Sequence, residues 1–245
     1  MEEFGSISFS FPAGFSETDR RALLETPMVV RWLRKMEREF RLSRVEFVSV
    51  DWMRREPRRA LFAKLRADAR DLSGRPTNGI VLLRGDAVGI LVVLRVEGEA
   101  EPRLLLTRQA RVPAAEPSLA EIPAGMMDGS ESPREVAVRE MKEETGLDVS
   151  EEELVDLLPA HPDGYLSSVG LMDERLYLFA YEKTVTADEL RKICSGEFGL
   201  AEENEHIVLE AVPASRGAEL QDGKSLTAWA LWNLGRNAHQ EGETR

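Results

Sequence analysis

Residues 125–147 read GMMDGSESPREVAVREMKEETGL, and this stretch is the most informative part of the chain. A glycine is followed after five residues by a glutamate, and after seven more by the run REMKEETGL. The specified polar and glycine positions are Gly125, Glu131, Arg139, Glu140, Glu143, Glu144 and Gly146, and bulky aliphatic residues fill positions 141 and 147. An acidic surface helix with a glycine cap is the plain alternative, but it requires none of these spacings.

The second half of this stretch predicts a helix over residues 131–144, because most of its residues are good helix formers. Ser130 or Ser132 can cap its start, and Pro133 suits an early helical position. Gly146 is suited to end it, since glycine readily adopts the left-handed conformation found just past helix C-termini.

Three carboxylates of this helix indicate a divalent cation. Glu140 and Glu144 lie one turn apart on one face, about 6 Å along the axis, and Glu143 lies beside them. Like charges at this spacing destabilise a helix unless a cation compensates them. Oxygen ligands favour Mg²⁺ or Mn²⁺ over zinc, and Mg²⁺ commonly shares its site with substrate phosphates. Arg139, four residues before Glu143, could hold that carboxylate by a bidentate contact or form an ordinary surface ion pair.

A second acidic run, residues 199–206 with the sequence GLAEENEH, precedes an expected strand. By composition alone it is a solvated loop. A metal site formed by helix carboxylates still requires a base to activate water, and a loop on the opposite side is the natural source of that base.

Composition limits the classes of function. The 245 residues carry a formal charge of −12, which argues against a general nucleic-acid binder. Cys194 is the only cysteine, so the chain has no internal disulfide and no zinc cluster of cysteines. No apolar run reaches the roughly 18 residues that a membrane span requires. The N-terminus does not read as a targeting peptide. We expect a cytoplasmic protein, with a trimmed organellar targeting segment left open.

The first 75 or so residues are Arg-rich and the remainder is Glu-rich. Pro27 begins an expected amphipathic helix that extends to Phe40. Residues 45–52 look extended, and residues 61–70 alternate between apolar and charged side chains, which predicts a strand with one buried face.

The rest of the chain reads as strands around one helix, with a helix at its end. The expected strands are residues 80–83, 87–96, 104–107, 175–183 and 206–212, and the apolar run 88–94 predicts a central strand buried on both faces. Residues 225–237 predict a terminal helix with Leu226, Trp229 and Leu234 facing inward. This order implies an α/β/α arrangement.

Residues 125–147 resemble the signature of Nudix hydrolases. The chain is more specifically similar to the ADP-sugar and ADP-ribose pyrophosphatase branch, above all to plant-type ADP-sugar diphosphatases with a long N-terminal extension. The stretches that carry this resemblance are 79–81, 84–88, 107–113, 121–126 and 199–200. It implies an α+β protein with the Nudix fold, an α/β/α sandwich with a mixed sheet, over residues 85–245. It also implies a small N-terminal α+β region, residues 1–84, that forms a homodimer and contributes to the partner's substrate pocket.

The resemblance also implies roles for individual residues. The metal ligands would be the Ala124 carbonyl, Glu140, Glu144 and Glu205. The catalytic residues would be Glu143 and Glu203, with Glu203 as the general base. The substrate would contact Arg111, Glu121 and Met126. Structural positions of the signature would be Gly125, Glu131, Arg139 and Gly146. The residues themselves leave Arg111 open as a strand-edge surface arginine and Glu121 as a structural carboxylate.

One departure from the family pattern affects the substrate. Many ADP-ribose hydrolases of this branch carry Ser-Pro-Gly with a glutamate downstream, whereas this chain has Ser168, Val169 and Gly170, with Glu174 following. The missing proline weakens a strict ADP-ribose assignment and makes ADP-glucose an equal candidate.

We therefore expect Mg²⁺-dependent hydrolysis of ADP-sugars to AMP and a sugar 1- or 5-phosphate, with Mn²⁺ as the alternative cation. The expected partners are the nucleotide-sugar substrate and a second copy of the chain, without nucleic acid or membrane. Another Nudix substrate, such as UDP-glucose, NADH or a dinucleotide, is the alternative within this class. The alternative from another class is a catalytically silent binder of nucleotide sugars.

Overall fold

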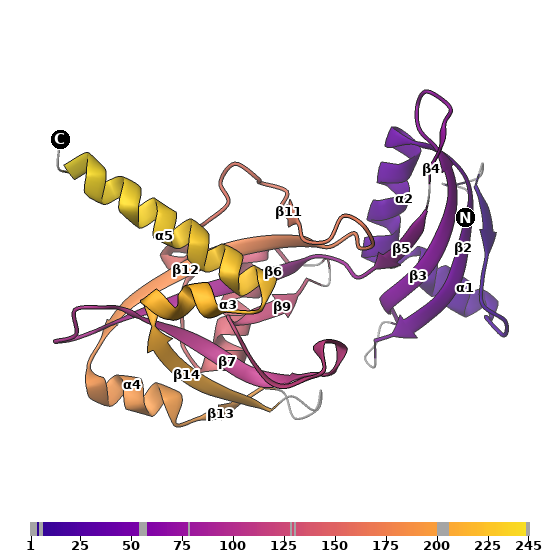
Figure 1. Cartoon of the computed structure of the whole chain (residues 1–245). Coiled ribbons are helices and arrows are strands. Elements are labelled where there is room, and N and C mark those ends of the chain that lie inside the picture. The colour runs from indigo at the N-terminus through magenta and orange to yellow at the C-terminus, as the bar shows by residue number, and fades with distance from the viewer. Residues whose placement is uncertain are drawn as a thin grey trace. The chain divides into compact units, whose positions relative to one another are not determined.

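The computed structural model describes residue 4 and residues 7–53, 58–77, 79–127, 129, 131–199 and 206–243. The chain divides into two compact units. The first unit comprises residues 1–86 and 166–175, and the second comprises residues 87–165 and 176–245. Figure 1 shows both units, with residues 1–86 of the first unit in indigo and purple.

The first unit is a sheet covered on one side by helices. Its strands are β1 (Ser8–Ser10), β2 (Arg41–Trp52), β3 (Ala60–Arg70), β4 (Pro76–Thr77) and β5 (Ile80–Leu83), in the order β1-β2-β3-β4 with β5 also paired to β3. Its helices are α1 (Glu17–Leu24) and α2 (Pro27–Glu39). The expected helix after residue 26 and the extended segments are confirmed.

A separate core explains how this unit holds together. In β3 the side chains of Ala63, Leu65 and Ala67 point inward and alternate with exposed charged residues, as the period-two pattern predicted. They pack with Val29 and Leu33 of α2, both of which are fully buried.

Residues 166–175, which lie far along the chain from residue 86, belong to this first unit. Leu82 N donates to the Leu171 carbonyl at 2.9 Å, and Arg84 N donates to Asp173 Oδ1 at 2.8 Å. Arg84 also pairs with Glu174. Glu174 therefore lies in a charge network of the first unit.

The second unit contains a mixed sheet in the order β10-β12-β6-β7-β14-β13, with β11 on β12, β8 on β7 and β9 on β6. The strands are β6 (Ala87–Val96), β7 (Arg103–Arg111), β8 (Glu116–Glu121), β9 (Ala124–Met126), β10 (Val155–Asp156), β11 (Tyr165–Leu166), β12 (Arg175–Val185), β13 (Glu197–Phe198) and β14 (Ile207–Pro213). The helices are α3 (Pro133–Thr145), α4 (Ala187–Cys194) and α5 (Gly223–Glu243), and short 3-10 helices are η2 (Val112–Ala114), η3 (Glu151–Glu153) and η5 (Ala214–Glu219).

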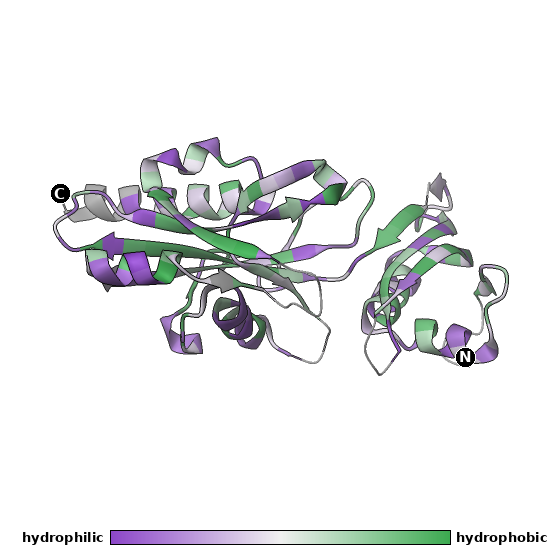
Figure 2. Ribbon diagram, turned by 90° about the horizontal axis from the view of Figure 1, so that it is seen from below, coloured by the Kyte–Doolittle hydropathy of each residue, from purple (hydrophilic) through white to green (hydrophobic). Residues whose placement is uncertain are grey.

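Strand β6 lies in the middle of this sheet, parallel to β12 and antiparallel to β7 and β9. Its residues from Val88 to Leu94 are buried on both faces. Ile90 and Val92 pack in the core beneath α3, whereas Leu91 and Val93 pack in the core beneath α5. The sheet is therefore sandwiched between helices, as expected, and Figure 2 shows hydrophobic residues concentrated along its long strands.

The inward face of α5 differs from the expectation. Leu226 and Leu234 are 39% and 66% exposed, whereas Ser225, Ala228 and Trp232 are buried. Ser225 tolerates burial because its Oγ accepts a hydrogen bond from Ile122 N at 2.9 Å. Trp229 is partly buried against this core, as expected, but the two leucines of the expected inward face are not.

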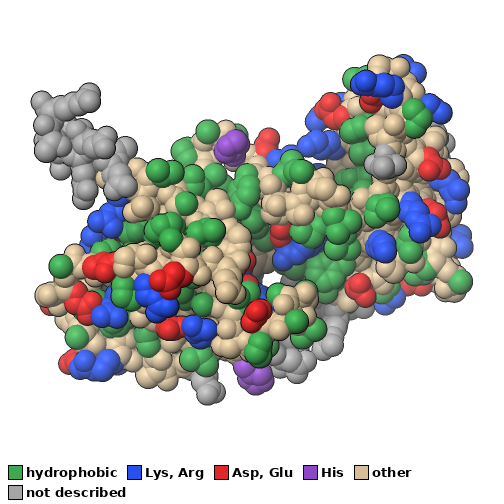
Figure 3. All heavy atoms as spheres, viewed as in Figure 1, with side chains coloured by type: hydrophobic (Ala, Val, Ile, Leu, Met, Phe, Trp, Pro, Cys, Tyr) green, Lys and Arg blue, Asp and Glu red, His purple; other side chains and the backbone are tan. Residues whose placement is uncertain are grey.

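The visible surface of the second unit mixes Lys and Arg with Asp and Glu side chains (Figure 3). Many of these charges form local pairs, such as Arg103 with Glu99 at 2.7 Å. Within the described residues, no helix is long and apolar enough to cross a membrane.

Candidate functional site

Helix α3 begins and ends where its local chemistry dictates. Ser132 Oγ accepts from Glu135 N at 3.2 Å, and Glu135 Oε2 accepts from Ser132 N at 2.6 Å, which together form a capping box. Pro133 occupies the first turn. Gly146 ends the helix with φ of 70°, and its N–H donates to the Lys142 carbonyl at 3.0 Å. Ser132 is thus the cap; Ser130 lies outside the described residues.

The buried face of α3 carries acids as well as apolar residues. Val136, Ala137 and Met141 are fully buried in the core against β6. Glu140 and Glu144 are buried too, with exposed fractions of 8% and 4%. Buried carboxylates are costly unless they are paired, so their contacts define the site.

Strand β9 brings the chain that precedes α3 against these acids. It pairs with β6, so that Gly125 lies opposite Val88. Ala124 N donates to Glu144 Oε2 at 3.0 Å, which holds the Glu144 carboxylate beside the backbone of β9. The Ala124 carbonyl and Met126, both predicted site groups, belong to the same half-buried strand.

Gly125 is required by close packing. A Cβ atom at this position would lie 1.8 Å from Glu140 Oε1 and 1.9 Å from its Cδ. Any side chain would therefore displace Glu140. This explains in physical terms why the signature begins with a glycine.

Arg139 organises the acids of the signature. Its Nη1 lies 2.7 Å from Glu140 Oε1 and 3.2 Å from Glu143 Oε2, and its Nη2 lies 3.4 Å from Glu131 Oε2. The expected contact with Glu143 is present, but through one oxygen, and Arg139 bridges further carboxylates. Burial alone would lower the pKa of Arg139, yet the charges of Glu140, Glu131 and Glu143 outweigh it and raise the pKa.

The second acidic run is connected to α3 at its start. Gly199 N donates to the Glu143 carbonyl at 3.5 Å. The ring of Phe198 packs so closely on Gly146 that a Cβ atom there would lie 2.8 Å from it. Glu203 and Glu205 themselves lie outside the described residues, so the predicted base and metal ligand remain predictions.

The predicted substrate residues Arg111 and Glu121 form an ion pair across the β7–β8 hairpin. Arg111 Nε and Nη2 lie 2.8 and 2.6 Å from Glu121 Oε2. Glu121 is 4% exposed, whereas the Arg111 side chain is 37% exposed. Lys224 lies 3.5 Å from the other oxygen, Glu121 Oε1. Lys224 was absent from the predicted site because nothing in the local sequence connects it with a glutamate 103 positions away.

The acids of α3 are the right kind of ligand for a hard cation, but the described acids are too few to complete a metal site. All the candidate ligands offer oxygen atoms, the preferred donors of Mg²⁺. Glu140 and Glu144 lie where Gly125 and Ala124 of β9 contact α3. Within the described part of the chain, no three His, Cys, Asp or Glu side chains are gathered closely enough to hold a metal ion. A complete set would thus require Glu205 or backbone and substrate oxygens.

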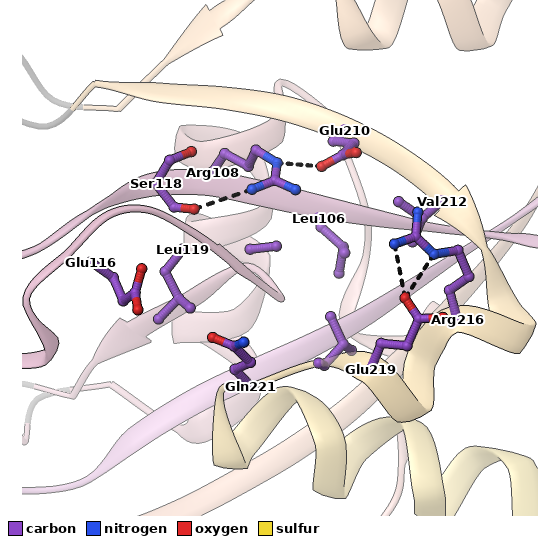
Figure 4. Close-up of a pocket in the computed structure, with 12 residues that line it drawn as sticks. Leu106, Arg108, Glu116, Ser118, Leu119, Glu210, Val212, Arg216, Glu219 and Gln221 are labelled. Atoms are coloured by element: carbon purple, nitrogen blue, oxygen red, sulfur yellow. Dashed lines mark hydrogen bonds and ion pairs between the residues drawn. The ribbon is translucent and has the colours of Figure 1, made fainter.

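A pocket of about 280 Å³ lies elsewhere in the second unit, among β7, β8, β14 and η5 (Figure 4). Its arginines already have partners. Arg108 pairs with Glu210 and donates to the Ser118 carbonyl at 3.1 Å, and Arg216 lies 2.8 Å from Glu219. The residues that line it include none of the predicted site residues.

Comparison with known proteins identifies the family. Residues 83–224, more than half of the chain, match the NUDIX domain. The chain belongs to the Nudix family. It is 32% identical to Nudix hydrolase 14, chloroplastic, of Arabidopsis thaliana, over 96% of this chain and 78% of that protein. It is also 30% identical to an ADP-ribose pyrophosphatase of Bacillus subtilis, over 60% of this chain and 71% of the relative.

A solved structure supports the Nudix fold. The crystal structure of an ADP compounds hydrolase matches with a TM-score of 0.52 and 17% identity, and the match covers 81% of this chain and 97% of the other. At this identity the likeness concerns the fold alone. The predicted α+β Nudix fold and the assignment as a Nudix enzyme are confirmed. Nudix hydrolases generally act with divalent metal ions, which agrees with the oxygen donors of α3.

Proposed function

We propose that this Nudix enzyme hydrolyses the diphosphate bond of ADP-sugars, with ADP-ribose and ADP-glucose as the candidate substrates. The observation that carries the proposal is the buried acidic pair, Glu140 and Glu144, held against the backbone of Ala124 and Gly125. The names of two comparison proteins, an ADP-ribose pyrophosphatase and an ADP compounds hydrolase, support ADP derivatives as the substrate class.

In the proposed reaction, water attacks one phosphorus of the diphosphate, and the bridging P–O bond breaks. The products are AMP and a sugar 1- or 5-phosphate. Glu203 accepts the proton of the attacking water, and Arg111 binds a phosphate oxygen through its guanidinium. Mg²⁺ held by Glu140, Glu144, Glu205 and the Ala124 carbonyl would supply polarisation of the phosphoryl oxygens and stabilise the leaving phosphate.

Glu143 and Arg139 complete the proposed arrangement. The Glu143 carboxylate faces the guanidinium of Arg139 at 3.2 Å, and its backbone carbonyl accepts from Gly199, where the second acidic run begins. We assign Glu143 to the catalytic set on this basis. Arg139 keeps the neighbouring acids oriented, because its guanidinium contacts Glu131, Glu140 and Glu143 and supplies a compensating charge.

A substrate panel with matched variants tests the proposal. ADP-ribose, ADP-glucose, UDP-glucose, NADH and a diadenosine polyphosphate are incubated with and without Mg²⁺, and phosphate is measured after a coupled phosphatase step. We expect metal-dependent turnover of an ADP-sugar. Glu144→Gln should reduce this turnover by at least about 100-fold, because it removes a charged ligand of the cation that is proposed to stabilise the transition state. Glu135→Gln is the control, because glutamine retains the capping box on the same helix.

The other outcomes of this panel separate the alternatives. Preferred turnover of NADH, UDP-glucose or the dinucleotide would retain the Nudix chemistry but replace the substrate. Binding of ADP-ribose without turnover of any compound would identify a catalytically silent binder. Equal activity of Glu144→Gln and wild type would contradict the role of the α3 acids.

We further propose that the chain acts as a homodimer through its N-terminal region, residues 1–84. Several large apolar side chains of this region are exposed, including Val48 at 38%, Leu72 at 64% and Ile80 at 58%. A C2 contact is the usual way in which soluble proteins cover such surface. Size-exclusion chromatography with light scattering measures the state directly, and a monomeric, fully active deletion of residues 1–75 would contradict the proposal.

A further inference from the structure

Glu121 is a buried carboxylate with a cation on each oxygen. It ends strand β8 and is 4% exposed. Arg111 contacts Oε2 through Nε and Nη2, at 2.8 and 2.6 Å, and Lys224 Nζ lies 3.5 Å from Oε1. The two cations therefore come from different elements: Arg111 ends β7, and Lys224 lies in the first turn of α5.

Lys224 is itself held in place. Its side chain is 14% exposed, and Nζ lies 3.0 Å from Asp222 Oδ2. Asp222 Oδ2 also accepts from Ser225 N at 3.0 Å, and Ser225 Oγ accepts from Ile122 N at 2.9 Å. The first turn of α5 thus contacts the end of β8 at two points, the side chain of Glu121 and the backbone of Ile122.

The charges of this group balance only when Lys224 is present. Arg111 and Lys224 offset Glu121 and Asp222. Without Lys224, the buried Glu121 would depend on Arg111 alone, and the group would carry a net negative charge. Arg111 would then be held more tightly by protein and would be less available to an anionic substrate, because its guanidinium would have to compensate the buried Glu121 carboxylate without the lysine.

We propose that Lys224 is a positioning residue, which holds Glu121 and through it sets Arg111 to receive the diphosphate of the substrate. This inference rests on the proposed role of Arg111 in substrate binding. Lys224 acts through Glu121 and makes no contact with the substrate. Its contact with Glu121 also connects α5 to the segment that continues into Ala124 and Gly125, three and four residues after Glu121.

A double-mutant cycle separates this role from a direct contact. Wild type, Lys224→Met, Glu121→Gln and the double variant are compared by steady-state kinetics with ADP-ribose and Mg²⁺. Lys224→Met should raise KM by about 10-fold, the usual scale for a lost hydrogen bond to a charged group, with a much smaller change in kcat. In the Glu121→Gln background the same substitution should change KM little, because the partner is already neutral.

Two further variants serve as controls. Lys224→Arg keeps the charge and should recover most of the wild-type KM. Lys142→Met removes a lysine whose side chain is 56% exposed and pairs with Asp148, so it should leave KM unchanged. If Lys224→Met does not fold, Lys224→Gln replaces it, because glutamine keeps a polar end in this buried group. Circular dichroism establishes which variants fold.

An unchanged KM in Lys224→Met, or an equal rise with and without Glu121, would overturn the inference. Failure of the proposed function looks different, since wild type would then turn over none of the ADP-sugars. In that case the urea unfolding midpoints of the same four proteins test whether Lys224 and Glu121 interact in the folded state. Non-additive shifts of the midpoint support an interaction between Lys224 and Glu121, and additive shifts overturn it.

Discussion

Replacing Gly125 by alanine should damage both stability and activity. The new Cβ atom would lie 1.8 Å from Glu140 Oε1, whereas ordinary contact begins at 3.4 Å, so the carboxylate must retreat by about 1.6 Å. Its contact with Arg139 Nη1, at 2.7 Å, cannot survive a displacement of that size unless Arg139 follows. Overpacking a closed site of this kind costs about 1–3 kcal/mol.

The activity should fall more steeply than the stability. A misplacement on the order of 1 Å in a catalytic arrangement costs roughly 100-fold in rate. Initial rates with ADP-ribose and Mg²⁺ measure the loss of activity. Thermal unfolding measures the loss of stability, and Tm should fall by about 2–4 °C per kcal/mol for a chain of this size. Both are to be recorded on the same preparation.

Two companion variants isolate the cause. Gly235→Ala introduces the same atom into α5 where nothing lies within 4 Å, so it should stabilise the helix by up to about 1 kcal/mol. In a Glu140→Ala background the clashing atoms are gone, and Gly125→Ala should then cost little further stability. If Gly125→Ala alone were as stable and active as wild type, the close approach of β9 to α3 would be refuted.

Other parts of the fold give further predictions. Burial by itself raises the pKa of Asp222, but the charge of Lys224 and the hydrogen bonds from Ser225 outweigh it, so the pKa lies below its ordinary value of 3.8. Asp222 should therefore stabilise the fold above about pH 4 and lose this contribution as the pH falls through its lowered pKa; urea midpoints of Asp222→Asn and wild type should converge in acid. Leu33→Ala, at a fully buried position, should cost about 2–5 kcal/mol in urea unfolding. Arg139→Ala should lower turnover with kcat falling more than KM rises, and an unchanged kcat would contradict its role.

The elements around the site could be predicted from the sequence because their signals are local. The capping box at Ser132, the glycine at 146 and the apolar run of β6 each act within a few residues. The spacing of Glu140 and Glu144 likewise fixes a shared helical face before any packing is considered. Burial of both acids follows only once β9 is laid against α3.

Features that depend on distant partners could not be predicted. The buried face of α5 was predicted only in part. The burial of Ser225 was missed because its hydroxyl is satisfied by Ile122, 103 positions earlier in the chain. Lys224 escaped notice for the same reason, since its partner Glu121 lies across the unit. Local periodicity contains no information about which polar side chain will find a buried partner.

The discontinuous first unit has a consequence for synthesis on the ribosome. Residues 1–86 leave the exit tunnel early, yet Arg84 reaches its acceptor Asp173 across 89 positions of sequence. At about 5–20 residues per second, that acceptor is translated roughly 4–18 s after Arg84. During this interval the edge of β5 lacks its later neighbour Leu171. The nascent chain therefore exposes an unfinished strand edge of the kind that chaperones shield.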